Sequence, residues 1–324
     1  MQKRVDILFK KEYVKLHVNL IPQFLTEEAG MGIERVFVVG AGVMGAGIAQ
    51  VCAQAGVPVV VSDVKQEILD RAMKSIAWSV EKLVGKGKLG EKLETIMARI
   101  QTVTDLALSA RADLVLEAAF EKLDVKQEIF RKLDETCRPE TLIASNTSAI
   151  PITELAAVTR RPERVLGLHF FNPVPMMQAV EVIKGAATTD ETVSKGREFV
   201  LKIGKEPIMV NRDVAGFLIN RINYPSTLEA MRMVEEGIGS VEDIDKGLRL
   251  ASGRRMGIFE TSDMVGLDVT YGALMAMYHE TGDPRWFPPM ILRRKVRAGH
   301  LGRKTGRGWY EYNEEGGRKE KRTS

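Results

Sequence analysis

The chain has 324 residues, of which 44% are hydrophobic and 28% charged, a composition typical of a soluble globular protein large enough for two domains. The net charge of +4 is too small to indicate nucleic-acid binding, and the apolar runs are too short to span a membrane. Two cysteines without metal-ligand spacing and four histidines without paired spacing argue against a metal site and favour a cytoplasmic protein.

Residues 1–32 differ from the rest of the chain. Lysine and arginine crowd this segment, but it also contains Asp6 and Glu12 and lacks serine. A cleaved transit peptide is normally rich in serine and poor in acids. We therefore expect an N-terminal arm that is loosely attached to the folded part.

Strands and helices are expected to alternate from residue 33 onward. Apolar runs predict strands at residues 35–39, 57–62, 113–116, 141–145, 165–171, 179–183 and 207–210. Helical periodicity lies between several of them, at residues 43–55, 68–83 and 123–137. Such alternation implies parallel strand pairing with right-handed crossovers.

The character of the sequence changes near residues 211–215. Helical patterns then cover residues 216–236, 241–250 and 267–281, and no strand pattern returns until residues 308–310. The predicted fold is therefore a Rossmann-type doubly wound α/β domain followed by a smaller all-α domain. The expected parts are an arm over 1–32, the α/β domain over 33–213, the helical domain for substrate and dimerisation over 214–314, and a disordered tail over 315–324.

A glycine-rich turn follows the first predicted strand. Gly40, Gly42 and Gly45 form a G-x-G-x-x-G pattern, with Val43 and Met44 inside it, directly before a helix. The first glycine permits the tight turn, the second lets a pyrophosphate approach the backbone, and the third allows close packing of helix and strand. The helix N-terminus then offers N–H groups to the phosphates. The pattern predicts a dinucleotide-binding site.

Asp63 ends the second predicted strand, about 20 residues after the glycine turn, where a carboxylate can hold a ribose 2′-hydroxyl. A 2′-phosphate would meet this carboxylate with like charge, so NAD is favoured and NADP is the second choice. A flavin nucleotide can use the same fingerprint, so the motif by itself leaves the cofactor open.

The segment from Gly167 to Gly185 contains an acid–base pair suited to alcohol oxidation. His169 lies in one predicted strand and Glu181 in the next, twelve residues later. If the strands bring them together, the carboxylate fixes the tautomer of the imidazole and stabilises its protonated form. A core histidine beside a surface glutamate is the alternative that spacing alone leaves open.

Several motifs, taken in order, give a resemblance to the L-3-hydroxyacyl-CoA dehydrogenases. They are GAGVMGAGIAQ, Glu117-Ala118-Ala119, SNTSAI at 145–150, GLHFFNPVP, VEVIKG, GFLINR at 216–221 and GRKTGRGWY at 302–310. The resemblance covers residues 33–312 and implies the NAD-dependent, reversible oxidation of a 3-hydroxyacyl-CoA, with short chains such as 3-hydroxybutyryl-CoA expected first. It also implies a place in fatty acid or butanoate metabolism, an acyl-CoA as small-molecule partner, no nucleic acid or membrane, and a homodimer.

The resemblance assigns roles to individual positions. His169 would be the base and Glu181 its orienting partner, while Ser148 and Asn220 would hydrogen-bond the substrate near the reacting carbon. Contacts with NAD would come from Glu117, Lys122, Ser148, Asn172 and Lys304, in addition to the glycine turn. Ser79 and Lys86 would contact coenzyme A, although the lysines at 82–88 can equally be a solvated charged surface.

Two other functions share these features. Dehydrogenases of sugar acids or carnitine use a similar architecture without coenzyme A, so the region around Ser79 and Lys86 discriminates between the two enzyme classes. A non-catalytic NAD-binding protein on this scaffold is the third reading, and the presence of His169 and Glu181 counts against it. One departure from the family lies at Ile258, where proline is usual, and we expect it to alter the entry of a helix in the second domain.

Overall fold

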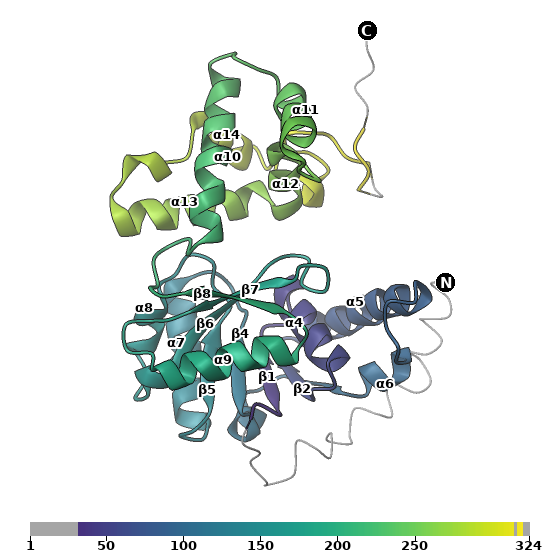
Figure 1. The fold of residues 1–324 in the computed structure, drawn as a ribbon, viewed down its shortest axis with the longest axis vertical. Coiled ribbons are helices and arrows are strands. Elements are labelled where there is room, and N and C mark those ends of the chain that lie inside the picture. The colour runs from purple at the N-terminus through teal and green to yellow at the C-terminus, as the bar shows by residue number, and fades with distance from the viewer. Residues whose placement is uncertain (1–31, 314–315, 320–324) are drawn as a thin grey trace. The chain divides into compact units, whose positions relative to one another are not determined.

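A computed structural model describes residues 32–313 and 316–319 of the chain. The chain divides into two compact units with the boundary between Val214 and Ala215 (Figure 1). The arm expected over residues 1–32 lies outside the described residues except for Gly32.

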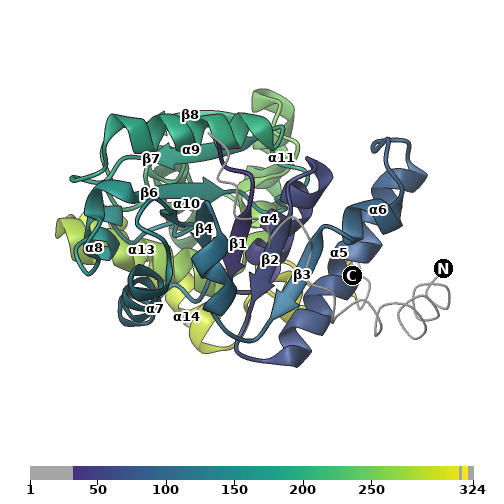
Figure 2. The ribbon, with the colours of Figure 1, turned by 90° about the horizontal axis from the view of Figure 1, so that it is seen from below.

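The first unit is built on one eight-stranded sheet in the order β3-β2-β1-β4-β5-β6-β7-β8. Figure 2 shows β3, β2, β1, β4, β6, β7 and β8 following one another in this order across the unit. The strands are β1 (Val36–Val39), β2 (Val59–Ser62), β3 (Ile100–Val103), β4 (Leu114–Glu117), β5 (Leu142–Ser145), β6 (Val165–Phe170), β7 (Ala179–Ile183) and β8 (Glu206–Val210). Residues of β1, β2, β4, β5 and β6 are all buried, as expected of a parallel sheet covered on both faces.

Helices connect these strands and pack against the sheet. They are α4 (Val43–Gln54), α5 (Gln66–Gly85), α6 (Leu93–Met97), α7 (Leu123–Thr136), α8 (Ile152–Ala156) and α9 (Asp190–Lys202), with 3-10 turns at Ala107–Arg111 and Pro162–Arg164. α4 contacts β1, β2 and β3, and α9 contacts β6, β7 and β8. The buried apolar side chains of these elements form the core of the unit.

Two features of the sheet differ from the prediction. The edge strand β3 was not predicted, because Gln101 and Thr102 interrupt its apolar run and three of its four residues are partly exposed. The pairing of β6 with β7 is antiparallel, whereas alternation had implied parallel pairing throughout. Only residues 171–178 join these two strands, and a parallel pair needs a crossover of a dozen residues or more.

The second unit is helical, as predicted. It contains α10 (Ile219–Glu235), α11 (Val241–Ser252), α12 (Ile258–Val265), α13 (Leu267–Thr281) and α14 (Met290–Arg297), with 3-10 turns at Pro284–Trp286 and Arg303–Thr305. Its core includes Phe259, whose ring packs against that of Trp309 at 4.6 Å between centroids. Within the described part of the chain, no helix has the length and apolarity needed to cross a membrane.

The strand expected at residues 308–310 is absent, and these residues form a bend. The backbone N–H groups of Trp309 and Tyr310 donate to the two carboxylate oxygens of Asp263, at 2.8 and 2.9 Å, so they are not used in a strand ladder. Residues 316–319 of the expected tail are described: the Arg318 guanidinium lies over the Tyr310 ring, 3.9 Å from its centroid. The other residues of that expected tail, 315 and 320–324, lie outside the described residues.

Candidate active site

The topology of the sheet identifies where a ligand binds. β1 is paired with β2 on one side and with β4 on the other, so the direction in which successive strands are added reverses between β1 and β4. In open α/β sheets ligands bind beyond the carboxyl ends of the strands at such a switch point. The glycine turn follows β1 and residues 118–122 follow β4, so both segments border this point.

The glycine turn has the geometry of a phosphate cradle. Gly40 has a φ of +100°, and a Cβ atom on it would lie 2.7 Å from the carbonyl oxygen of Ala118. A Cβ atom on Gly45 would overlap the carbonyl oxygen of Gly40, so a side chain there is excluded. A Cβ atom on Gly42 would meet no atom within 4 Å, so the backbone at this position is open to an incoming group. The first turn of α4 contains no acidic residue, which suits an anion at its N-terminus.

Asp63 lies beside the glycine turn. Its Oδ2 atom accepts a hydrogen bond of 2.9 Å from the backbone N–H of Ala41, which fixes the carboxylate directly after β2. The Gly40 N–H donates in turn to the carbonyl oxygen of Ser62, at 2.7 Å. The strand-end carboxylate that the sequence predicted is therefore held against the loop whose ligand it is expected to contact.

Glu117 is placed differently from the prediction. Its side chain is fully buried at the end of β4, where Oε1 accepts from Lys126 Nζ at 2.6 Å and from the Ala119 N–H at 2.7 Å. Its Oε2 atom accepts from Ser145 Oγ at 2.6 Å. Because both oxygens are enclosed, this carboxylate ties β4 to β5 and to α7 and does not face a ligand.

Glu121 is the residue of this segment that the sequence reading missed. Its Oε1 atom accepts hydrogen bonds from Thr147 Oγ1 at 2.6 Å and from the Ser148 backbone N–H at 2.7 Å, and the Ser148 hydroxyl lies 3.2 Å away. Desolvation raises the pKa of the Glu121 carboxyl, but the Lys126 ammonium and these hydrogen bonds outweigh it and hold that pKa below its ordinary value. The ionised carboxylate therefore holds Ser148 in place.

The structure brings His169 and Glu181 together. They are directly opposite each other in the β6–β7 ladder, and His169 Nδ1 lies 2.6 Å from Glu181 Oε2. Glu181 is fully buried and His169 is 6% exposed. A carboxylate can only accept, so Nδ1 carries the hydrogen, and Nε2 is the nitrogen that can take up a proton. The register of the ladder makes this contact possible, because residues directly opposite each other have Cβ atoms only about 4.5–5.5 Å apart.

The β5–β6 region is linked to this pair. The side-chain oxygen of Asn146, in the loop that carries Ser148, accepts from the Phe170 N–H at 2.9 Å. The end of β6 is therefore tied to the loop after β5. Asn172 is the second residue after β6 and is exposed, and the ring of Phe171 packs at 4.7 Å from that of His169. His169, Ser148 and the glycine turn all belong to the carboxyl edge of the sheet.

The remaining predicted residues of the first unit are on its surface. Lys122 is exposed at the N-cap of α7, and Val43 is 73% exposed at the start of α4, next to the partly buried Met44. Ser79 lies on α5 and is partly buried, and Lys86 is the exposed residue that ends this helix. The structure therefore leaves Ser79 and Lys86 available to a ligand along α5.

The second unit contains the other two predicted residues. Asn220, expected to contact the substrate, is in the first turn of α10. The ammonium of Lys304, expected to contact NAD, forms an ion pair with the Asp268 carboxylate at 2.6 Å. Ile258 is the first residue of α12, a position at which proline is favoured because its missing N–H is not needed there and its fixed φ suits the helix. The helix begins there without proline, since Asp245 accepts from the N–H groups of Phe259 and Glu260.

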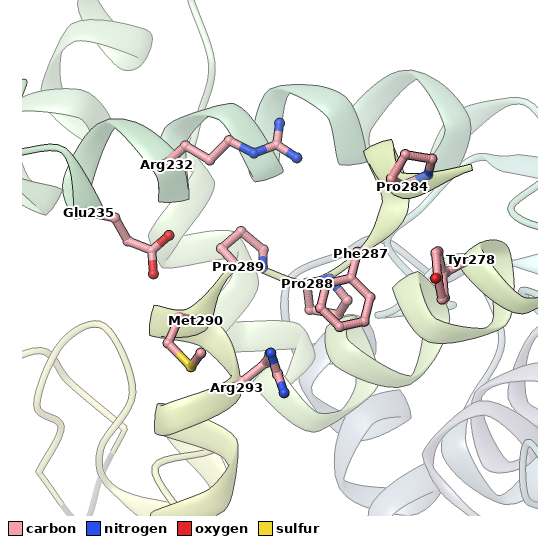
Figure 3. A pocket seen from close by; sticks show the side chains of 9 residues that line it. All are labelled: Arg232, Glu235, Tyr278, Pro284, Phe287, Pro288, Pro289, Met290 and Arg293. Carbon is pink, nitrogen blue, oxygen red and sulfur yellow. The ribbon is translucent and has the colours of Figure 1, made fainter. Parts of the chain in front are cut away.

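A pocket of about 480 Å³ also lies within the second unit (Figure 3). The side chains around it come from α10, α13, α14 and the segment between them: Arg232, Glu235, Tyr278, Pro284, Phe287, Pro288, Pro289, Met290 and Arg293. Glu235 accepts from the Ile291 N–H at 2.6 Å, and the Arg293 guanidinium lies over the Phe287 ring at 5.1 Å. Glu235 therefore joins α10 to α14, and none of the predicted site residues lines the pocket.

A mostly parallel sheet with a glycine turn at its switch point and a buried histidine–carboxylate pair at its carboxyl edge defines the class of dinucleotide-dependent dehydrogenases. Two family models match the chain: the NAD-binding domain of 3-hydroxyacyl-CoA dehydrogenase over residues 35–214, and the C-terminal domain of the same enzyme over residues 216–312. The chain belongs to the 3-hydroxyacyl-CoA dehydrogenase family, and it is an NAD-dependent oxidoreductase.

Individual relatives agree with this assignment. A probable 3-hydroxybutyryl-CoA dehydrogenase of Deinococcus radiodurans is 46% identical over 85% of this chain and 99% of that protein. The crystal structure of an (S)-3-hydroxybutyryl-CoA dehydrogenase from Ralstonia eutropha matches with a TM-score of 0.82 and 42% identity, over 87% of this chain and all of that one. A 3-hydroxyadipyl-CoA dehydrogenase of Escherichia coli is 41% identical over 88% of this chain and 60% of that protein. Relatives of similar identity thus differ in the acyl group named.

Proposed function

We propose that the protein oxidises (S)-3-hydroxybutyryl-CoA to acetoacetyl-CoA, reversibly, with His169 as the general base. The observation that carries this proposal is the 2.6 Å contact between His169 Nδ1 and the buried carboxylate of Glu181. The relatives named for 3-hydroxybutyryl-CoA support the short chain, and the glycine turn with Asp63 supports NAD as cofactor.

The chemistry divides between the cofactor and the protein. Bound NAD⁺ supplies the acceptor for the hydride that leaves C3 of the alcohol. His169 Nε2 takes the proton of the 3-hydroxyl group, and the resulting imidazolium is stabilised by Glu181 because the carboxylate is buried and already in contact. In the reverse direction the imidazolium returns this proton to the oxygen of the ketone.

Other residues bind and orient the reactants in this proposal. Glu121 holds Ser148 through the backbone N–H of that residue, and the Ser148 hydroxyl turns its single hydrogen from Glu121 to the oxygen on C3. The open backbone at Gly42 and the N-terminus of α4 receive the pyrophosphate, and Asp63 binds the ribose. The family resemblance adds Asn220 for the substrate, Asn172 and Lys304 for NAD, and Ser79 and Lys86 for coenzyme A.

We further propose that the second unit forms a homodimer. Its helices expose large apolar side chains: Ile222 of α10 is 69% exposed, Leu250 of α11 is 77% exposed, and Val269 of α13 is 47% exposed. Light scattering after gel filtration is expected to give twice the mass of the chain. The mass of a single chain would contradict the dimer and leave the catalytic proposal intact.

The decisive experiment follows NADH absorbance after acetoacetyl-CoA is added to the purified protein. We expect rapid oxidation of NADH, a much slower reaction with NADPH, and none with free acetoacetate. A faster reaction with 3-oxoadipyl-CoA or a long-chain 3-oxoacyl-CoA would contradict the short-chain assignment. Turnover of a hydroxy acid that carries no coenzyme A would instead favour a dehydrogenase of sugar acids or carnitine. The Lys86→Glu substitution should raise KM for the CoA substrate and leave NADH binding unchanged.

A further inference from the structure

A buried lysine stands at the carboxyl edge of the sheet and has no part in the mechanism above. Lys205 directly precedes β8, and β8 pairs in parallel with β7 so that Ile208 lies opposite Glu181. Glu181 in turn lies opposite His169. Lys205 therefore lies at the edge of the sheet where the carboxyl end of β6 is found. It is two strands away from β6, the strand that contains His169.

The side chain of Lys205 is bonded to the loop between β6 and β7. Its ammonium donates to the carbonyl oxygen of Val174 at 2.9 Å and to that of Met177 at 2.8 Å, and the residue is only 5% exposed. These two carbonyl groups belong to a turn closed by hydrogen bonds from the N–H groups of Met176 and Met177 to the Pro173 oxygen. One cation therefore fastens both ends of a single turn.

This arrangement is unusual because it lacks a carboxylate. Among residues 32–313 and 316–319, no acidic side chain lies within ion-pair distance of Lys205, and burial lowers the pKa of its ammonium. A buried charge without a counter-ion is costly, and hydrogen bonds to carbonyl groups offset only part of the cost. A neutral or apolar residue would be the expected choice if filling the space were the only requirement.

The same turn is packed against the helix of the glycine loop. A Cβ atom added to Gly47 of α4 would lie 2.8 Å from Val174 Cβ, so the absence of a side chain at Gly47 allows the turn to approach. The turn follows Asn172, and it carries Met176 and Met177, which are 52% and 39% exposed. It thus joins the strand of His169 to the helix at the proposed pyrophosphate site.

We propose that Lys205 is a positioning residue of the active site: its ammonium holds the Pro173–Met177 turn in the place that productive binding requires. The inference rests on the proposed function, because the turn borders the proposed base. Lys205 itself touches neither substrate nor cofactor in this proposal and acts through the turn. A misplacement of about 1 Å at such a site is enough to cost roughly a hundredfold in rate.

The test compares Lys205→Met with Lys205→Arg and with the control Lys202→Met. Lys202 also donates to a backbone carbonyl, that of Ile33 at 2.8 Å, but it has no contact with the turn. For Lys205→Met we expect kcat to fall and KM for acetoacetyl-CoA to rise, each by about tenfold. Lys205→Arg keeps a cation and should recover most of this loss, while Lys202→Met should keep the parental kinetics.

Amide hydrogen exchange measures the turn without any substrate. In Lys205→Met the amides of Val174, Met176, Met177 and Gln178 should exchange faster than in the parent, while those of β1 and β4 are unchanged. A folded Lys205→Met protein with a lower melting temperature but parental kcat, KM and exchange would overturn the proposal. If instead the parent fails to turn over acetoacetyl-CoA, the proposed function fails, and the exchange result still decides whether Lys205 holds the turn.

Gly47→Ala provides an independent perturbation if Lys205→Met does not fold. Alanine favours the helix more than glycine does, so any loss comes from the contact with Val174. Faster exchange of the turn together with reduced kcat would support the proposal. Parental kinetics in a Gly47→Ala protein whose turn exchanges faster would refute it, because the position of the turn would then be irrelevant to catalysis.

Discussion

Replacing Glu181 by glutamine tests whether its charge, and not only its shape, supports His169. The substitution keeps the size of the side chain and an oxygen that can accept from Nδ1, but it removes the negative charge. In the parent the carboxylate is fully buried and 2.6 Å from the imidazole, so the imidazolium formed on proton transfer is stabilised at short range. The amide can offer only a neutral hydrogen bond.

The size of the effect follows from this geometry. Two unit charges about 4 Å apart attract by about 4 kcal/mol at an effective dielectric constant of about 20. A neutral hydrogen bond recovers roughly 1 kcal/mol of this. A net loss of about 3 kcal/mol corresponds to a decrease in kcat of roughly 10²-fold, since each 1.36 kcal/mol is a factor of about ten.

The assay is the rate of NAD⁺ reduction with saturating (S)-3-hydroxybutyryl-CoA, the direction in which the imidazolium forms, with circular dichroism to confirm the fold. Asp134→Asn is a matched control, because Asp134 is also a buried carboxylate of the first unit, paired with Arg160 and Arg161 near the end of α7. The control should lose stability and keep its kcat. A folded Glu181→Gln protein with the parental kcat would refute the reasoning.

Three further predictions concern the cofactor site and stability. Gly42→Ala should fold like the parent but bind NADH more weakly, because its methyl group points into open space, whereas Gly45→Ala should lose both stability and NADH binding in fluorescence titrations. Asp63→Asn keeps an acceptor for the Ala41 N–H but loses the charge, so the ratio of kcat/KM for NADPH to that for NADH should rise by about tenfold. Burial opposes ionisation of Asp113, but its interactions with Arg35 outweigh burial and hold the pKa of the Asp113 carboxyl below its ordinary value. The contribution of this ion pair to the free energy of unfolding is therefore present above about pH 4 and is lost as the pH falls below it. In urea denaturation, Asp113→Asn should therefore be less stable than the parent at pH 7, and the difference should shrink as the pH falls below about 4; a constant difference would contradict this.

The sequence predicted the parts of the site that depend on local patterns. The glycine turn needs only a strand, three glycines and a helix in succession, and Asp63 follows at a fixed spacing. His169 and Glu181 were predicted as a pair, although their contact required a register that spacing alone does not determine. The short connection of residues 171–178 favours antiparallel pairing, and the register then places the two residues opposite each other.

Features that depend on tertiary contacts were not predicted. Glu121 contacts Thr147 and Ser148, which are 26 and 27 residues away, and no local pattern marks this contact. Lys205 reads as an ordinary charged residue after a helix until the fold places the turn beside it. The expected strand at residues 308–310 fails for the same reason, because Asp263, more than 40 residues earlier, accepts its N–H groups.

The account as a whole depends on the imidazole of His169 being the proton acceptor for the substrate alcohol. The most direct measurement is kcat for His169→Gln with (S)-3-hydroxybutyryl-CoA and NAD⁺, alongside the Kd for NADH. A general base of this kind contributes about 10²- to 10⁴-fold, so kcat should fall by that factor while NADH binds as in the parent. A variant that turns over at the parental rate would show that the proton goes elsewhere.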